Sequence, residues 1–137
     1  MLQFYFLSIF ANLLAGTALA SEYLGAKLPS FASIKEVLAK KGFRVTVGFA
    51  AAIIGIIKLI IRAPGNAVPV AGDLLPALAG IGMGLALLVD FFKQRVSKPS
   101  EALEKAEKIA MTYRLPVGIV GLATAVLHFI FPATVIL

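Results

Sequence analysis

Long apolar stretches alternate with shorter polar ones along the chain. Four stretches are almost entirely hydrophobic, and they cover about residues 2–20, 45–61, 74–92 and 115–137. Each approaches the roughly 20 residues that a helix needs to cross about 30 Å of hydrocarbon. Because a chain in lipid must satisfy its own backbone hydrogen bonds, these stretches are expected to be helices. The pattern therefore predicts an all-α integral membrane protein with four transmembrane helices.

Two of the polar segments between these spans carry apolar residues at helical spacing. The segments are residues 30–41 and 100–112, and each begins at a Pro-Ser pair, which is typical of a helix start. Short amphipathic helices beside a membrane usually lie in its interface. We predict one interfacial helix in each segment. Simple connection of two spans and docking of a protein are the two roles that the pattern leaves open.

The first half of the chain resembles the second half. Residues 29–48 align with residues 99–118 without a gap, and the matching pairs include Pro29 with Pro99, Ser30 with Ser100, Lys35 with Lys105, Arg44 with Arg114, and Gly48 with Gly118. We interpret this as a tandem repeat, with repeat 1 in residues 1–63 and repeat 2 in residues 64–137. Each unit is a helix, an amphipathic helix and a second helix. Because two spans return the chain to its starting side, the two copies must be parallel, as in some transporters.

Composition agrees with a membrane location. The chain has 137 residues, of which 60% are hydrophobic, and a mean hydropathy of +0.96. A soluble domain is about 45–50% apolar. The net charge of +6 does not come from a basic helix interleaved with aromatic residues, so nucleic acid is not an expected partner. Cysteine is absent, which excludes disulfides and thiol chemistry.

The position of the basic residues predicts the orientation. All Lys and Arg residues except Lys58 and Arg62 lie in the loops at 21–44 and 93–114. By the positive-inside rule both loops are expected in the cytoplasm and both termini outside the cell (inner) membrane. Ala18, Leu19 and Ala20 imitate a signal-peptidase site, which would remove the first span. The missing basic residue before this span and its match to the third span favour an uncleaved helix.

Four residues near the outer surface could form a polar membrane site. Lys58 and His128 hold equivalent repeat positions, about 21 Å along their helices from Arg44 and Arg114. Ionisable groups at this depth suggest function, although Lys58 can extend to the surface and His128 can be a structural residue. Arg62 and Asp73 lie near the same surface. Asp73 is first of all expected to cap the third span, and Arg62 or Lys58 could pair with it.

Charged residues also mark the cytoplasmic helix ends. Glu22 and Asp90 close the first and third spans, while Arg44 and Arg114 open the second and fourth. A carboxylate at a helix C-terminus opposes the helix dipole, and a nearby arginine would offset that cost. We predict ion pairs among these four residues, with cation binding as the alternative.

Small residues predict where the helices pack. Gly80 and Gly84 in the third span, Gly48 and Gly55 in the second, and Gly118 and Gly121 in the fourth have spacings that allow helix backbones to approach closely. Asn12 lies mid-span and is expected to bond across helices. Some of these faces could pack inside one bundle, and the rest could bind other subunits.

The pattern favours a non-catalytic protein. The chain has one histidine, no cysteine and no pair of carboxylates within a span, so we predict no enzyme activity, metal or cofactor. The leading hypothesis is a scaffold or accessory subunit whose partners are the lipid bilayer and other membrane subunits or a second copy of itself. The alternative is a small homo-oligomeric transporter or channel for an anionic or proton-coupled solute.

Overall fold

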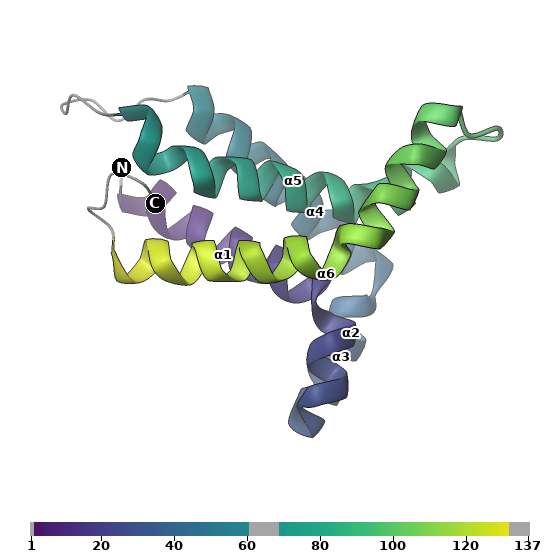
Figure 1. The fold of residues 1–137 in the computed structure, drawn as a ribbon, viewed down its shortest axis with the longest axis horizontal. Coiled ribbons are helices and arrows are strands. Elements are labelled where there is room, and N and C mark those ends of the chain that lie inside the picture. The colour runs from purple at the N-terminus through teal and green to yellow at the C-terminus, as the bar shows by residue number, and fades with distance from the viewer. Residues whose placement is uncertain (1, 61–68, 132–137) are drawn as a thin grey trace.

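A computed structural model describes the backbone of residues 2–60 and 69–131, and the side chains of residues 3–60 and 74–131. Every regular element in these residues is helical, as the apolar pattern predicts. The elements are α1 (Leu2–Leu19), α2 (Ser21–Lys27), the 3-10 helix η1 (Pro29–Phe31), α3 (Ala32–Ala39), α4 (Lys41–Ile60), α5 (Pro69–Arg95) and α6 (Glu101–Ile130). Helices α1, α4, α5 and α6 lie side by side as a bundle (Figure 1).

Three helices are long and apolar enough to cross a membrane, which is consistent with a membrane location. They are Lys41–Ile60, Leu74–Arg95 within α5, and Glu101–Ile130. The first predicted span meets the same criteria only as α1 and α2 together, and these two helices meet at an angle of 70°. The described residues therefore contain three candidate spans, or four if this bent pair is one span.

The third predicted span begins earlier than the sequence suggested. Helix α5 starts at Pro69 and runs to Arg95, whereas the apolar stretch covers residues 74–92. Proline suits a first helical position because its missing N–H would have no partner inside the helix. Asp73 therefore lies within α5, and the prediction that it caps the helix is wrong. Helix α4 likewise begins at Lys41, before its apolar stretch.

The predicted interfacial helix at 100–112 and the fourth span from 115 are one continuous helix, α6. Its start is as predicted, because the hydroxyl of Ser100 accepts a hydrogen bond from the N–H of Leu103 at 3.3 Å. The prediction of a separate interfacial helix is wrong. Pro116 lies inside α6, where a proline kinks a helix by removing one hydrogen bond and crowding the preceding turn. Figure 1 shows α6 turning away from the bundle in its N-terminal part.

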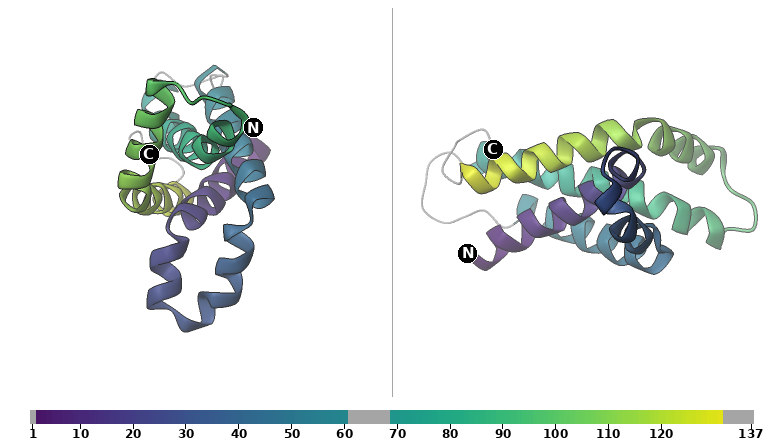
Figure 2. Two further views of the ribbon diagram at one scale, coloured as in Figure 1. Left: turned by 90° about the vertical axis from the view of Figure 1, so that its right-hand side faces the viewer. Right: turned by 90° about the horizontal axis from the view of Figure 1, so that it is seen from below.

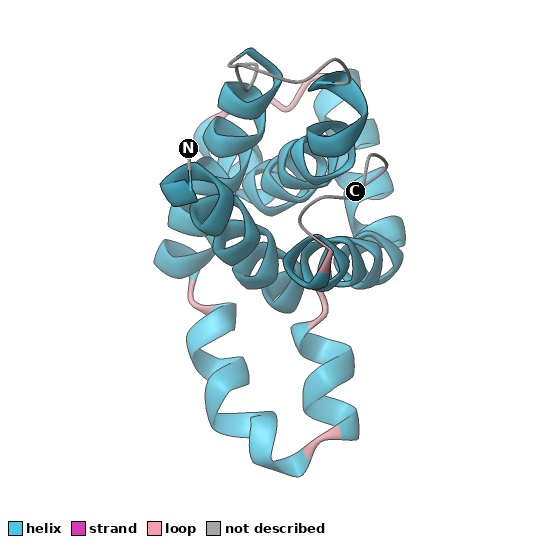
Figure 3. Cartoon of the chain, turned by 90° about the vertical axis from the view of Figure 1, so that its left-hand side faces the viewer, coloured by secondary structure: helices cyan, strands magenta, loops and turns pink. Residues whose placement is uncertain are grey.

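Helices α2 and α3 form a hairpin that projects sideways from the bundle (Figures 2 and 3). The predicted helix at 30–41 is present as η1 and α3, whereas α2 had no separate prediction. The side chain of Lys35 in α3 packs against Gly25 of α2, where a Cβ atom would lie 2.7 Å from Cδ of Lys35. Lys35 also pairs with Glu22 at 3.3 Å. Leu38 is buried in the main core and thus anchors the hairpin to the bundle.

Two helix pairs dominate the packing of the bundle. Helix α4 packs mainly against α5, and α1 packs mainly against α6, while α5 and α1 contact each other between the two pairs. The core consists largely of small residues, with a few larger ones. Its fully buried members include Ala15, Ala18, Ala51, Met83 and Leu87. Small residues let the helix axes approach closely, which compensates for the absence of a hydrophobic driving force between helices in lipid.

Candidate functional site

Helices of the bundle approach one another closely at several glycines. A Cβ atom at Gly84 would lie 2.6 Å from the carbonyl oxygen of Gly48, and one at Gly48 would lie 3.1 Å from that of Gly84. In the other helix pair, a Cβ atom at Gly118 would lie 3.0 Å from the carbonyl oxygen of Gly16. The separation at Gly84 is too short for a residue with a side chain unless the helices move apart, and the other two leave a Cβ atom very little room. The glycines therefore set the distance between α4 and α5 and between α1 and α6.

The other predicted packing glycines also lie between helices. Gly55 faces the backbone of α5 at Ala77, where a Cβ atom would lie 2.7 Å from the carbonyl oxygen. Gly80 lies beside both α4 and the side chain of Asn12, which donates a hydrogen bond to the carbonyl of Pro76 at 2.9 Å. Gly121 faces the buried thioether of Met83. Asn12 thus links α1 to α5 across the centre of the bundle.

Several polar side chains of α1 and α6 are buried. They are Ser8, Asn12, Thr124 and His128, each less than 9% exposed. The ring of Tyr5 lies 4.8 Å from that of His128, centroid to centroid, and its hydroxyl donates to the backbone carbonyl of His128. Sequence reasoning did not single out Tyr5, Ser8 or Thr124. An aromatic residue near the end of a span is typical of a membrane interface, which was the one signal available for Tyr5.

Of the four side chains of the predicted outer polar site, the structure describes those of Lys58 and His128, so the site stays a prediction. Lys58 and His128 lie in the last turns of α4 and α6, where a cation suits the helix dipole. These two helices each pack against α1 and α5, so they lie on opposite sides of the bundle. Arg62 lies outside the described residues. The backbone of Asp73 belongs to α5, and its side chain lies outside the described part.

The four charged residues predicted at the helix ends lie close enough to influence one another. Arg44 in α4 is half-buried and experiences the charges of Arg114, Asp90 and Glu22, in decreasing order of strength. The carboxylates also interact with lysines: Glu22 pairs with Lys35 at 3.3 Å, and Asp90 acts on Lys93. Lys93 itself forms a short ion pair with Glu107. This end of the bundle therefore carries a network of opposite charges contributed by α2, α4, α5 and α6.

Two polar atoms at the same end are buried without a hydrogen-bond partner among the described residues. They are the hydroxyl oxygen of Ser21 and Nε of Arg114. Ser21 is only 1% exposed and begins α2, directly after the 70° bend. No sequence pattern distinguished Ser21 from other polar residues at span ends, because its burial depends on the bend.

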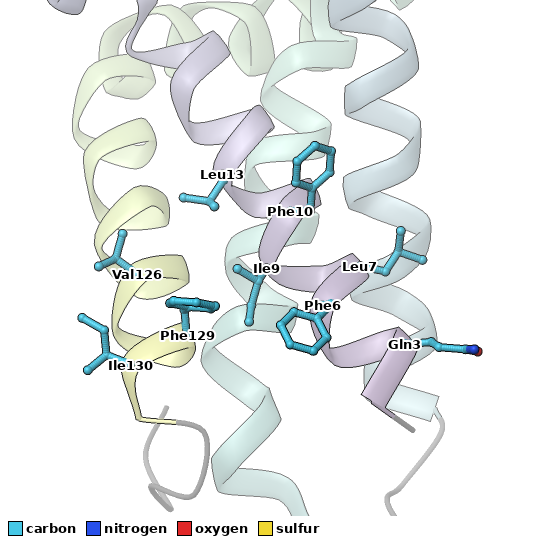
Figure 4. Close-up of a pocket in the computed structure, with 9 residues that line it drawn as sticks. All are labelled: Gln3, Phe6, Leu7, Ile9, Phe10, Leu13, Val126, Phe129 and Ile130. Carbon is cyan, nitrogen blue, oxygen red and sulfur yellow. The ribbon is translucent and has the colours of Figure 1, made fainter.

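An apolar groove lies between α1 and α6 at the opposite end of the bundle. It has a volume of about 850 Å³ and is lined by Gln3, Phe6, Leu7, Ile9, Phe10, Leu13, Val126, Phe129 and Ile130. Figure 4 shows these side chains along the two helices, with Ile9 of α1 drawn between Phe6 of the same helix and Phe129 of α6. Phe10 and Phe129 are 61% and 58% exposed, so the groove opens to the surroundings of the bundle.

The described residues contain no cluster of side chains that could bind a metal ion. No group of three or more His, Cys, Asp or Glu side chains among them is placed to hold an ion. The acidic residues at the helix ends are instead mixed with arginine and lysine. Such a mixture favours ion pairing over cation coordination.

Two comparisons with known proteins find a match to this chain. A protein-family model matches residues 1–128. An uncharacterized protein of Treponema pallidum (strain Nichols) is 33% identical over 140 residues, covering the whole of both chains. No solved structure matches the chain.

Proposed function

The chain belongs to the family of the uncharacterized Treponema pallidum protein, and from its own helices we propose that it is a non-catalytic membrane subunit, a small scaffold or accessory component of a larger membrane assembly. The observation that carries the proposal is the apolar groove between α1 and α6. A helix of a second subunit, with apolar side chains at helical spacing, fits a groove of this kind.

The amount of uncovered helix surface supports the proposal. Only 28% to 39% of each candidate span is buried within the chain. Lipid covers such surfaces in any membrane protein. A groove lined by phenylalanines suits a second helix better than lipid tails, because the side chains of a helix can fill the groove at high packing density.

Tight packing of the interior supports a scaffold over a transporter. At five glycines between neighbouring helices, a single added Cβ atom would lie 3.0 Å or less from a backbone oxygen. Met83 fills the space beside Gly121 and has no exposed surface. A solute path along the bundle axis would require these helices to separate.

We further propose that the chain crosses the inner membrane four times as two parallel repeats. The contact of Gly48 with Gly84 and the contact of Gly118 with Gly16 support this arrangement. Gly48 matches Gly118 in the repeat, and Gly16 matches Gly84 when the alignment slips by two residues, as it does between Glu22 and Asp90. In this proposal the bent pair α1–α2 is the first span with its cytoplasmic extension. The basic loops face the cytoplasm, and both termini face outward.

Purification from native membranes in a mild detergent tests the scaffold proposal. We expect the 14.4 kDa chain to elute as part of a defined larger complex. Phe10→Ala, which removes an aromatic side chain from the groove, should release most of the chain, because loss of an interface anchor costs about 2 kcal/mol or more, which is roughly thirtyfold in affinity. Val120→Ala is the matched control, since Val120 is 63% exposed on α6 outside the groove.

A transporter remains the second candidate, and the burial of His128 beside Tyr5 favours it. Reconstitution of the purified chain in liposomes separates the two proposals. Flux of an anion or proton that is lost in His128→Leu would favour transport. A clean monomer without a partner, together with such flux, would contradict the scaffold proposal.

A further inference from the structure

The hairpin of α2 and α3 has one broad apolar face. Lys35 of α3 packs against Gly25 of α2 and pairs with Glu22, and these contacts fix the sides that the two helices turn toward each other. Because the helices are antiparallel, helical spacing then places the apolar side chains of both on the same face of the hairpin. These side chains are Leu24, Leu28, Ile34, Val37 and Leu38. All except Leu38 are partly or largely exposed.

This apolar face is turned toward the part of the bundle that is proposed to cross the membrane. Leu38 is buried in the same core cluster as Ala15 and Ala18 of α1. Phe31 also packs against that cluster. Ile34 lies one helical turn from both Phe31 and Leu38 and therefore points to the same side, but 51% of it is exposed. The face thus points to the level at which α1 is surrounded by lipid, and away from the cytoplasm.

The hairpin runs across the direction of the spans. Helix α1 ends at Leu19, and α2 begins at Ser21 after a bend of 70°. Figures 1 and 2 show the hairpin leaving the bundle sideways at this point. A segment that leaves a membrane bundle sideways at the end of a span lies parallel to the membrane surface. An amphipathic helix in that position buries its apolar face about 5–10 Å deep at the boundary of headgroups and acyl chains.

The polar residues of the hairpin suit an anionic surface. Tyr23 and Lys27 lie on the edge of α2 that faces away from α3, with the ammonium group 6.0 Å from the centre of the ring. Tyrosine is typical of the membrane interface, and the anionic lipids of the cytoplasmic leaflet attract lysines that lie near them. Lys40 adds an exposed positive charge where α3 returns to the bundle.

We propose that the α2–α3 hairpin lies on the inner leaflet of the membrane, with its apolar face at the boundary of headgroups and acyl chains and its lysines beside anionic phosphates. The proposal rests on the membrane topology of the proposed function, but it does not depend on the groove between α1 and α6. A cytoplasmic protein is the other class of partner for an apolar face. The direction of Leu38 and Ile34 favours lipid, because this face is turned away from the cytoplasm.

Single spin labels on the full chain test the proposal, in vesicles of phosphatidylcholine and phosphatidylglycerol that contain no other protein. Collision with oxygen, which concentrates in hydrocarbon, is compared with collision with a water-soluble nickel complex. We expect the oxygen-to-nickel ratio to be severalfold higher at Ile34→Cys than at Glu36→Cys. Glu36 is the matched control, because it is exposed on the opposite face of the same helix. Equal ratios at the two positions overturn the proposal.

A third label separates this result from a failure of the proposed topology. Val120 is 63% exposed on α6, within a candidate span, so Val120→Cys should report hydrocarbon wherever the hairpin lies. A label in hydrocarbon at Val120→Cys together with one in water at Ile34→Cys contradicts the hairpin proposal alone and points to a protein partner. Labels in water at both positions contradict the membrane topology as well.

A substitution on the apolar face tests whether contact with lipid holds the hairpin in place. Ile34→Glu puts a carboxylate on this face, and burying an unpaired charge is costly, so a label at Leu28→Cys should move into water and its ratio should fall severalfold. Ser33→Glu adds the same charge at an exposed position outside the face and should leave the ratio unchanged. Leu38 stays buried in both variants and keeps the hairpin attached to the bundle. The same ratio in both variants overturns the proposal.

Discussion

At the scale of single residues, glycines set how closely several of the helices pack, because glycine has no side chain to hold a neighbouring backbone away. Gly84 and Gly82 are neighbours on α5 but differ in surroundings. A Cβ atom at Gly84 would collide with the backbone of α4 at Gly48 and Ala52, whereas one at Gly82 would have no atom within 4 Å. A substitution at Gly84 therefore disturbs the packing of α4 on α5, whereas the same substitution at Gly82 changes only the helix propensity of that position.

We predict that alanine at these two positions changes the stability of the folded chain in different ways. Gly84→Ala should destabilise the folded chain by about 1–3 kcal/mol, because overpacking moves α4 away from α5. Gly82→Ala should be neutral or stabilising by up to about 1 kcal/mol, because alanine favours the helix. Reversible unfolding in mixed detergent micelles measures both. Equal stability of the two variants would mean that the Gly48–Gly84 contact does not hold the helices together.

Residue patterns indicated these glycines but could not indicate Ser21. Spacing of small residues is visible in the sequence of Gly80 and Gly84, since a helix always puts such positions on one face. The burial of Ser21 depends on the turn of the chain between α1 and α2. The outer polar site stays a prediction, because the side chains of Arg62 and Asp73 lie outside the described residues. Lys58 and His128 share a repeat position, and they lie on helices that each pack against α1 and α5.

At the scale of elements, the helices were more predictable than their ends. The length of the apolar stretches predicted α4, α5 and α6, because a helix needs a minimum number of residues to cross the hydrocarbon core. It could not indicate that α6 continues from Glu101 through Pro116 to Ile130. A proline removes only one hydrogen bond, and the turns on either side remain bonded. The amphipathic part and the apolar part are consequently one bent helix.

The bend in α6 gives a prediction about its shape. Pro116→Ala should restore the lost hydrogen bond and straighten the helix, so the distance between spin labels at Lys105→Cys and Val120→Cys should increase. Both positions are exposed, and the native chain has no cysteine. Pulsed electron paramagnetic resonance measures this distance. Labels at Lys105→Cys and Ile109→Cys, both before the proline, should keep their separation; an unchanged distance across Pro116 would assign the bend to packing instead.

At the scale of the whole molecule, the basic segments gather at one end. Helices α2 and α3 and the start of α6 extend from the same end of the bundle, opposite the start of α1 and the end of α6 (Figure 1). Charge counting predicted both loops on one side from the positions of Lys and Arg alone. It could not predict that one loop forms a sideways hairpin while the other extends from a bent helix, because these shapes depend on the 70° angle between α1 and α2 and on the bend of α6 around Pro116.

The arrangement predicts which residues share a compartment. Because the native chain has no cysteine, single-cysteine variants report one position each. Lys40→Cys and Lys105→Cys should react with a membrane-impermeant maleimide only after the cells are permeabilised. Gln3→Cys, exposed in the first turn of α1, should react in intact cells. Moving either basic loop outward would take several lysines away from the anionic inner surface of the membrane, which attracts them. Reaction of Lys40→Cys and Lys105→Cys from opposite sides would leave an odd number of crossings between them, and the paired-span topology would then be impossible.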